Sequence, residues 1–270
     1  MNRNAFCVFG LKTDLLHPGD DVVSHLAAAC AETEYGGFQD GDIIVVAESP
    51  LATAEGRVVA ISSVEPSEQA DRLGAEYGID PRLVQIVLDE SDRVVGGIPG
   101  FLLCLKNGTL LPNAGVDASN APPGSVVLLP VDPDASAARI RAGIRERCAA
   151  EVGVIVADSR THAMRLGSSG VAIGCSGLLS AIDECGRTDL FGRELHVTKR
   201  AVADCLASAA ELVMGEADEC VPGAVIRGSG LPIGDYSGVA AIDASECLFM
   251  GTALHAHPSL LDRKSEPEPL

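Results

Sequence analysis

The chain has 270 residues, of which 47% are hydrophobic but only 3% aromatic, and it contains no tryptophan. Its formal net charge of −18 makes it repel nucleic acid and anionic membrane surfaces, so we expect neither as a partner. The 29 glycines follow no period, which excludes collagen-like and solenoid repeats. The length allows one large domain or two modest ones, with a core of Ala, Val, Ile and Leu.

The cysteines and the hydropathy pattern predict a cytoplasmic protein. The nine cysteines form no CxxC pair, and an odd number without metal-like spacing favours a reducing compartment. The N-terminus is too polar for a signal peptide, and no apolar run reaches the length of a membrane-spanning helix.

The first half of the chain mixes strand and helix signals. Asp20 or Asp21 can cap a helix whose apolar stripe contains Val22, Leu26 and Cys30. Asp80-Pro81 is a helix start signal, because a capping side chain is followed by a proline in the first turn. We therefore expect helices at 20–35, 66–77 and 80–90, strands at 5–9, 42–47, 58–61 and 101–105 (the last one buried), and a polar stretch at 53–57.

The second half has longer elements. Asp132-Pro133 repeats the start signal before a helix that buries Ile140, Ile144 and Cys148. We expect strands at 126–129, 152–157, 171–174 and 221–227, and a helix at 198–214 that turns Val202, Leu206, Ala209 or Ala210, and Val213 inward.

Strands and helices do not alternate steadily, which favours an α+β fold with mixed sheets and flanking helices over a doubly wound sheet. We expect a single unit over residues 1–258, with the loop at 131–134 as the candidate boundary between two subdomains. The polar, proline-containing tail at 259–270 is predicted to be disordered.

The octapeptide at residues 113–120, NAGVDASN, lies between two apolar runs and combines Gly115, Asp117 and oxygen-bearing neighbours. Gly115 allows a backbone conformation that residues with a β-carbon avoid, and Asp117 is a suitable ligand for a hard cation. The alternative is an ordinary turn in which Asn and Asp side chains bond their own backbone.

Asp117, Asp158 with Ser159, and Glu216 each follow a strong strand or helix, where rigid scaffolds present ligands. Carboxylates and a hydroxyl suit magnesium or manganese, which share their coordination shell with substrate phosphates. Arg160, His162 and Arg165 follow Asp158 and could face those phosphates, whereas the alternative for each acid alone is a solvated loop residue.

Familiar catalytic motifs are missing from the sequence. It has no GxxxxGK[ST] phosphate loop, no HExxH zinc motif and no GxSxG elbow, and the glycines around Gly228 and Gly230 indicate a flexible turn. His255 and His257 could form a metal pair, but a solvated chain end is the simpler interpretation.

From about Phe9 to about Gly228 the chain resembles the gamma-glutamyl ligase of coenzyme F-420 biosynthesis. The resemblance is carried by Gly10-Leu11, residues 54–57 (AEGR), residues 113–120, Asp158-Ser159, residues 186–195 (GRTDLFGREL) and residues 212–216 (LVMGE). It implies an uncommon α+β fold, an intertwined homodimer with the site near the subunit interface, and ligation of L-glutamate to the carboxylate of an anionic small-molecule acceptor. It also implies GTP as co-substrate and magnesium or manganese as cofactor, with potassium as a further candidate cation.

The same resemblance assigns residues to roles. Asp117 and Asp158 are implied to be catalytic, and the metal positions are Asp117, Asp158, Ser159 and Glu216. The nucleotide positions are Gly10, Leu11, Lys12, Thr13, Glu48, Ser49, Thr53 and Asn120, with Arg160 added as a phosphate-binding cation.

Two departures from the family pattern leave alternatives open. Thr53 stands where the family usually has a lysine and Glu48 where it has a serine or threonine, and Arg160-Thr161-His162 replace a small residue and glycine. The alternatives are a paralogous amide-forming ligase with another acceptor or amino acid, and a nucleotide-binding module without catalysis.

Overall fold

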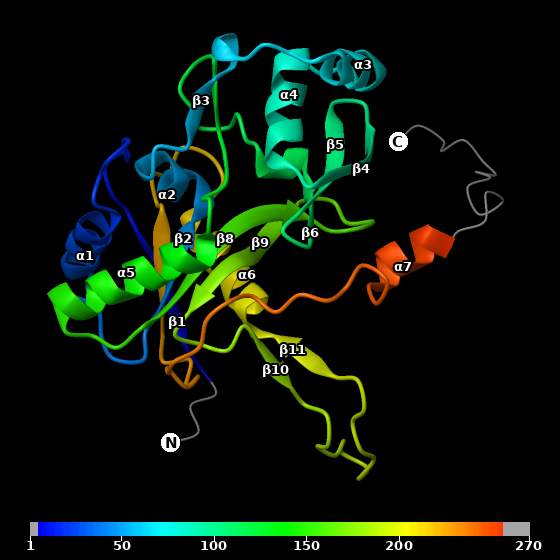
Figure 1. The fold of residues 1–270 in the computed structure, drawn as a ribbon. Coiled ribbons are helices and arrows are strands. Elements are labelled where there is room, and N and C mark those ends of the chain that lie inside the picture. The colour runs from blue at the N-terminus through cyan, green and yellow to red at the C-terminus, as the bar shows by residue number, and fades with distance from the viewer. Residues whose placement is uncertain (1–4, 256–270) are drawn as a thin grey trace, which may run out of the picture.

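A central mixed sheet of five strands organises the computed structural model, which describes residues 5–255 (Figure 1). Its strand order is β1-β12-β2-β8-β9, with β2 and β8 parallel and the other neighbours antiparallel. The strands are β1 (Cys7–Leu11), β2 (Ile43–Ala47), β8 (Gly153–Thr161), β9 (Ser168–Ser176) and β12 (Gly223–Arg227).

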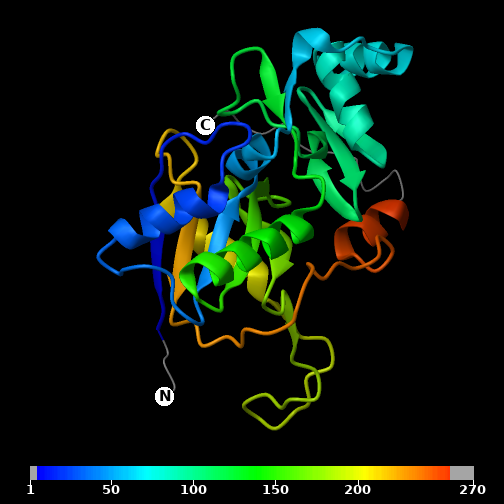
Figure 2. The same ribbon diagram turned by 60° about the vertical axis from the view of Figure 1, so that its left-hand side comes forward.

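Helices cover both faces of this sheet, as Figures 1 and 2 show from two directions. Its central strands are rich in Val and Ile and are buried on both sides, as expected for strands between two helical layers. One face packs against α1 (Val22–Glu32) and α5 (Pro133–Cys148), and the other packs against α6 (Val202–Met214). The α+β class expected from the sequence is therefore confirmed.

The predicted helix starts are confirmed by their caps. The side chains of Asp21, Asp80 and Asp132 accept hydrogen bonds from backbone N–H groups of the first turn, which have no partner inside a helix. Pro81 and Pro133 follow two of these caps, at a position where a missing N–H has no cost.

A second cluster of elements lies between α2 (Glu48–Ala54) and α5 in the chain and has its own core around Val84, Val87, Leu102 and Cys104. Arg57 and Lys106 both bond the Glu90 carboxylate, which connects this cluster to the chain leaving α2. Its elements are β3 (Val58–Ala60), η1 (Ile61–Ser63), α3 (Glu68–Tyr77), α4 (Pro81–Glu90), β4 (Arg93–Ile98), β5 (Phe101–Lys106), β6 (Thr109–Pro112), η2 (Asn113–Gly115) and β7 (Ser125–Val127).

A two-stranded arm, β10 (Ala181–Asp183) and β11 (Lys199–Ala201), projects from the body of the molecule (Figure 1). The loop between its strands exposes large apolar side chains, including Leu190 and Phe191. The last described element is α7 (Leu248–His255), and no described helix is long and apolar enough to cross a membrane.

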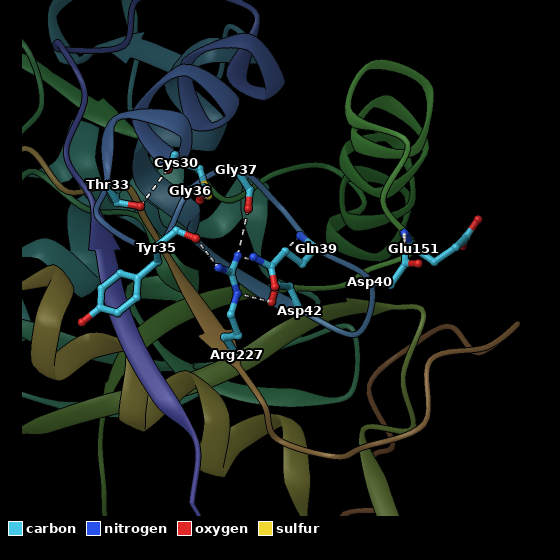
Figure 3. Close-up of polar contacts among 10 residues, drawn as sticks. All are labelled: Cys30, Thr33, Tyr35, Gly36, Gly37, Gln39, Asp40, Asp42, Glu151 and Arg227. Atoms are coloured by element: carbon cyan, nitrogen blue, oxygen red, sulfur yellow. Dashed lines mark hydrogen bonds and ion pairs between the residues drawn. The ribbon is translucent and has the colours of Figure 1, made fainter.

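Arg227, at the end of β12, fixes the connection between α1 and β2 (Figure 3). Its guanidinium donates to both carboxylate oxygens of Asp42, at 2.8 and 2.7 Å, and to the backbone carbonyls of Tyr35 and Gly37. Asp42 also accepts from the backbone of Gln39, so this buried carboxylate has several partners. The network aligns β2 beside β12 through the loop that precedes it.

Several expected boundaries were wrong. Thr53 and Ala54, expected to begin a polar stretch at 53–57, belong to the helix α2 (Glu48–Ala54), whose Leu51, Ala52 and Ala54 are buried. β8 does not end at residue 157 but runs to Thr161, since its polar end pairs with β9. The strand at Phe101 is only half-buried, with Phe101 53% exposed.

The strands β4, β10 and β11 were not expected, and residues 199–201 belong to β11 instead of the helix predicted at 198–214. Val213 is not part of the buried face of α6, because Ala203, Ala207 and Met214 fill it. The predicted tail at 259–270 and His257 lie outside the described residues.

Candidate active site

A cavity of about 690 Å³ opens where β2 ends beside β8. The two strands are parallel and Ala47 pairs with Ala157, so Glu48, which follows β2, lies next to Asp158 of β8. The β1–α1 connection and the loop before β12 reach this end of β2 too, because Leu11 pairs with Gly223 and Gly223 with Val46. Sequence segments that are far apart thus meet at one rim.

The octapeptide at 113–120 forms one wall of the cavity. Gly115 has φ +75°, and a Cβ there would lie 2.5 Å from the Leu129 side chain, so the residue must be glycine. Asp117 pairs with Val127 through two backbone hydrogen bonds, and one carboxylate oxygen accepts from the Ser119 N–H at 2.8 Å. Asp117 therefore closes an Asx-type turn and lines the cavity at the same time.

Asp158 and Ser159, within β8, line the same cavity. Arg160 Nε donates to Asp158 Oδ2 at 2.9 Å, and both side chains are nearly buried. Burial raises the pKa of the Asp158 carboxyl above its ordinary value even though Arg160 opposes the shift, and the charges of Asp117 and Glu216 add to it. The site is thus short of positive charge around Asp158.

Glu48 opens α2 and points into the same cavity, with its carboxylate accepting from the Ser49 hydroxyl at 2.7 Å. Burial and the neighbouring charges of Asp158 and Asp117 together raise the pKa of Glu48 to about 8, although the hydrogen bond from Ser49 opposes the shift. A bound cation would remove this repulsion, because opposite charge stabilises the ionised form of each carboxyl.

The segment after α6 completes the rim. Glu216 and Ala217 line the cavity, and the Asn120 side-chain amide donates to the Ala217 carbonyl at 3.0 Å. This bond joins the octapeptide to the loop that carries Glu216, although the two are far apart in sequence. Thr13, which also lines the cavity, donates its backbone N–H to the Cys220 carbonyl.

The structure brings together most, but not all, of the residues that the sequence assigned to the site. The predicted residues that line the cavity are Thr13, Glu48, Ser49, Asp117, Asn120, Asp158, Ser159 and Glu216. Gly10, Leu11, Lys12, Thr53 and Arg160 are not among its lining residues: Leu11 is fully buried in the core, Lys12 is exposed, and Thr53 lies in α2. Arg160 lines a neighbouring cavity of about 1140 Å³.

Sequence reasoning missed Glu211, which lines the cavity from α6. Burial raises the pKa of Glu211 to about 7, and the adjacent Glu216 carboxyl contributes. The sequence did contain a signal for this residue, because Glu211 is an acid in a helix of otherwise mostly small or apolar residues. Leu83 and Phe101, which form an apolar part of the wall, come from the second cluster and gave no local signal.

The lining residues fit a divalent cation by their chemistry, because carboxylate and hydroxyl oxygens are the donors that magnesium and manganese prefer. A buried, unpartnered carboxylate oxygen on Glu211 also indicates a missing partner. Within residues 5–255, no three His, Cys, Asp or Glu side chains are arranged to hold a metal ion by themselves. A cation here would thus need oxygens from water or from a phosphate ligand.

Comparison with known proteins identifies the family. The family model described as F420-0:Gamma-glutamyl ligase matches residues 10–228. The coenzyme F420:L-glutamate ligase of Methanopyrus kandleri is 44% identical over 79% of this chain and 82% of its own. The enzymes of the same name from Methanocaldococcus jannaschii and Haloarcula marismortui are each 42% identical, over 86% and 83% of this chain and 91% and 86% of their own. The chain belongs to the F420-0:gamma-glutamyl ligase family.

Proposed function

We propose that this protein is a GTP- and divalent-metal-dependent ligase that adds L-glutamate to the carboxylate of the coenzyme F420 precursor. Family membership supports the ligation, since the relatives are named coenzyme F420:L-glutamate ligases. The observation that carries the proposal is the convergence of Asp117, Asp158, Ser159, Asn120 and Glu216 on one cavity of such a chain.

Asp117, Asp158, Ser159 and Glu216 are the residues that would hold the metal. When bound, the metal supplies positive charge that offsets the negative charge of the nucleotide phosphates. Ser49, Asn120 and Thr13 offer hydroxyl and amide groups at the same rim for the nucleotide. The acidic residues alone would repel a triphosphate, so nucleotide and metal should bind together.

The reaction has two steps. An oxygen of the acceptor carboxylate attacks the γ-phosphorus of GTP. The bond between the γ-phosphorus and the β–γ bridging oxygen breaks, so that GDP leaves and an acyl phosphate forms. The amine of L-glutamate then attacks the acyl carbon, phosphate departs, and the amine loses its proton as the amide forms. The protein contributes mainly position and charge, which are the main contributions in phosphoryl transfer.

The protein acts as a homodimer in this proposal. The support is the arm, whose loop exposes Leu190 and Phe191, together with the β8–β9 turn, which exposes Met164 and Leu166 fully. Exposed apolar groups on projecting segments are typical of surfaces that a partner covers.

Product analysis tests the proposal. Mass spectrometry of a mixture with GTP, magnesium, L-glutamate and the deglutamylated precursor should reveal the glutamylated product and GDP. Asp117→Asn and Asp158→Asn should each abolish turnover, because an amide keeps the shape but loses the charge that holds the cation. Asp71→Asn, on the exposed face of α3, is the matched control and should turn over normally. Product formation by Asp158→Asn at the wild-type rate would remove Asp158 from the mechanism.

A further inference from the structure

Glu211 has a carboxylate oxygen without a partner. It lies in the last turn of α6 and lines the candidate active site. Its Oε1 is shielded from solvent. Among the described residues, this is the one buried side-chain oxygen or nitrogen atom without a hydrogen-bond partner. Such a group costs free energy unless a donor or a cation satisfies it, so it marks a place where a partner belongs.

The packing of α6 on β9 holds this carboxylate in place. The Ser208 hydroxyl donates to the Gly170 carbonyl at 2.8 Å. A Cβ on Gly170 would lie 2.5 Å from the Ala207 carbonyl oxygen, so helix and strand backbones approach as closely as glycine permits. Glu211 follows Ala207 and Ser208 by four and three residues and therefore lies on the same face of the helix, one turn further.

The acidic side chains around Glu211 have the wrong charge to satisfy it. The carboxyls of Glu216 and Asp158 both act on it, and the backbone N–H of Gly170 opposes them. Arg160, a cation of the same region, is bonded to Asp158. Among residues 5–255, Glu211 takes part in no salt bridge. Because its acidic neighbours repel its charge, a positive partner would satisfy it best, and the candidates are a shared proton and a metal ion.

We propose that Glu211 is a further ligand of the divalent cation that Asp117, Asp158, Ser159 and Glu216 would hold, so that α6 contributes directly to the metal site. This inference rests on the proposed function, because it assigns a further ligand to the metal of that site. It explains why an acidic side chain lies in the buried part of a helix that otherwise packs through small apolar residues. The alternative, a proton shared with Glu216, would give Glu211 no role in metal binding.

Manganese binding distinguishes the two. We would titrate Mn²⁺ into the full-length protein in the presence of a non-hydrolysable GTP analogue and follow the electron paramagnetic resonance signal of free Mn²⁺. Glu211→Gln should weaken binding of one Mn²⁺ by roughly 10- to 100-fold, the range seen even for outer-shell groups of metal sites. Glu146→Gln, on the exposed face of α5, removes the same charge far from the cavity and should bind as wild type does.

Thermal unfolding provides a second measurement. Without metal, Glu211→Gln should unfold at the same or a higher temperature than wild type, because the amide can donate to Glu216. Added Mn²⁺ and nucleotide should stabilise it less than they stabilise wild type. If Glu211→Gln does not fold, Glu211→Asp keeps the charge but withdraws the oxygens, and it should weaken Mn²⁺ binding in the same direction.

The outcomes are separable. Wild-type Mn²⁺ affinity in Glu211→Gln, or in Glu211→Asp where only that variant folds, would overturn the inference and leave the proposed metal-dependent ligase intact. A wild-type protein that binds no Mn²⁺ with the nucleotide would overturn both.

Discussion

At the scale of single residues, the pairing of Arg160 with Asp158 decides what this arginine can contribute to the site. Arg160 is 10% and Asp158 14% exposed in their side chains, and the guanidinium lines the neighbouring cavity instead of the candidate active site. A cation in this position orients and partly neutralises Asp158. We therefore expect it to act as a positioning residue, whereas the sequence predicted a direct contact with nucleotide phosphates.

Nucleotide titrations into Arg160→Ala separate these two roles. Loss of a direct charge-assisted contact should weaken GTP binding by roughly 10- to 100-fold with or without metal. If Arg160 acts through Asp158, as we expect, the affinity should fall only when magnesium is present and should match wild type in a chelator. Arg165→Ala, on the exposed β8–β9 turn, is the control for charge. An equal loss of GTP affinity with magnesium and with chelator would instead support a direct contact between Arg160 and the nucleotide phosphates.

The contact that Arg160 makes could not be predicted from the sequence. It lies two residues after Asp158 in β8, so both side chains lie on one side of the strand, and no local signal tells whether the guanidinium bonds that carboxylate or a ligand. Gly115 and Asp117 were predictable for the opposite reason. Their turn is specified by residues within the octapeptide itself, and the structure confirms both the left-handed glycine and the Asx-type turn.

At the scale of elements, the helix starts with an aspartate cap were the most predictable feature and short strands the least. Asp21, Asp80 and Asp132 cap their helices through local hydrogen bonds, which the sequence displays directly. The arm strands β10 and β11 have three residues each and pair only with one another, so no burial pattern reveals them. The connection between α4 and the chain after α2 depends on Glu90, whose partners lie far away in the sequence.

The Glu90 cluster should stabilise the protein in a pH-dependent way. Burial alone would raise the pKa of Glu90, but hydrogen bonds from Lys106 and Arg57 outweigh it and hold that pKa below its ordinary value of 4.5. A carboxyl with a lowered pKa in the folded state stabilises that state above its unfolded pKa and loses this contribution as pH falls.

We therefore expect Glu90→Gln to lower the free energy of unfolding by about 1–3 kcal/mol at neutral pH, since the charge-assisted bonds from Arg57 and Lys106 are weakened. The difference from wild type should shrink below about pH 4.5, as wild-type Glu90 becomes protonated. Urea unfolding of wild type and Glu90→Gln from neutral pH to below pH 4.5 would measure this difference. The variant Glu68→Gln, at an exposed position of α3, is the control. A difference that is constant with pH would mean that charge is not the cause.

At the scale of the whole molecule, the site is a product of sheet topology. The parallel alignment of β2 with β8 places Glu48 beside Asp158, and the antiparallel neighbours return residues 13–16 and the loop before β12 to the same edge. Strand order cannot be read from hydropathy, because every central strand has a similar Val- and Ile-rich pattern. The resemblance to a known family predicted the gathering of these residues where periodicity could not.

The arm provides the test of assembly. Its loop is ordered by Asp189, which accepts from the backbone of Phe191 and Arg193, so Leu190 at 100% and Phe191 at 84% exposure are presented to solvent by a defined turn. Covering each such side chain contributes about 1.5–3 kcal/mol. Replacing both with glutamate should therefore raise the dimer dissociation constant by more than about 100-fold.

Sedimentation velocity at micromolar concentration would reveal the change as a shift from dimer to monomer in the Leu190→Glu and Phe191→Glu double variant. Ile98→Glu introduces the same charge at a 65% exposed apolar position on β4, away from the arm, and should remain dimeric. Because the proposed metal and nucleotide ligands that line the cavity all come from one chain, the monomeric variant should still bind nucleotide with metal. A wild-type monomer would remove the dimer from the proposal, and a double variant that stays dimeric would place the interface elsewhere.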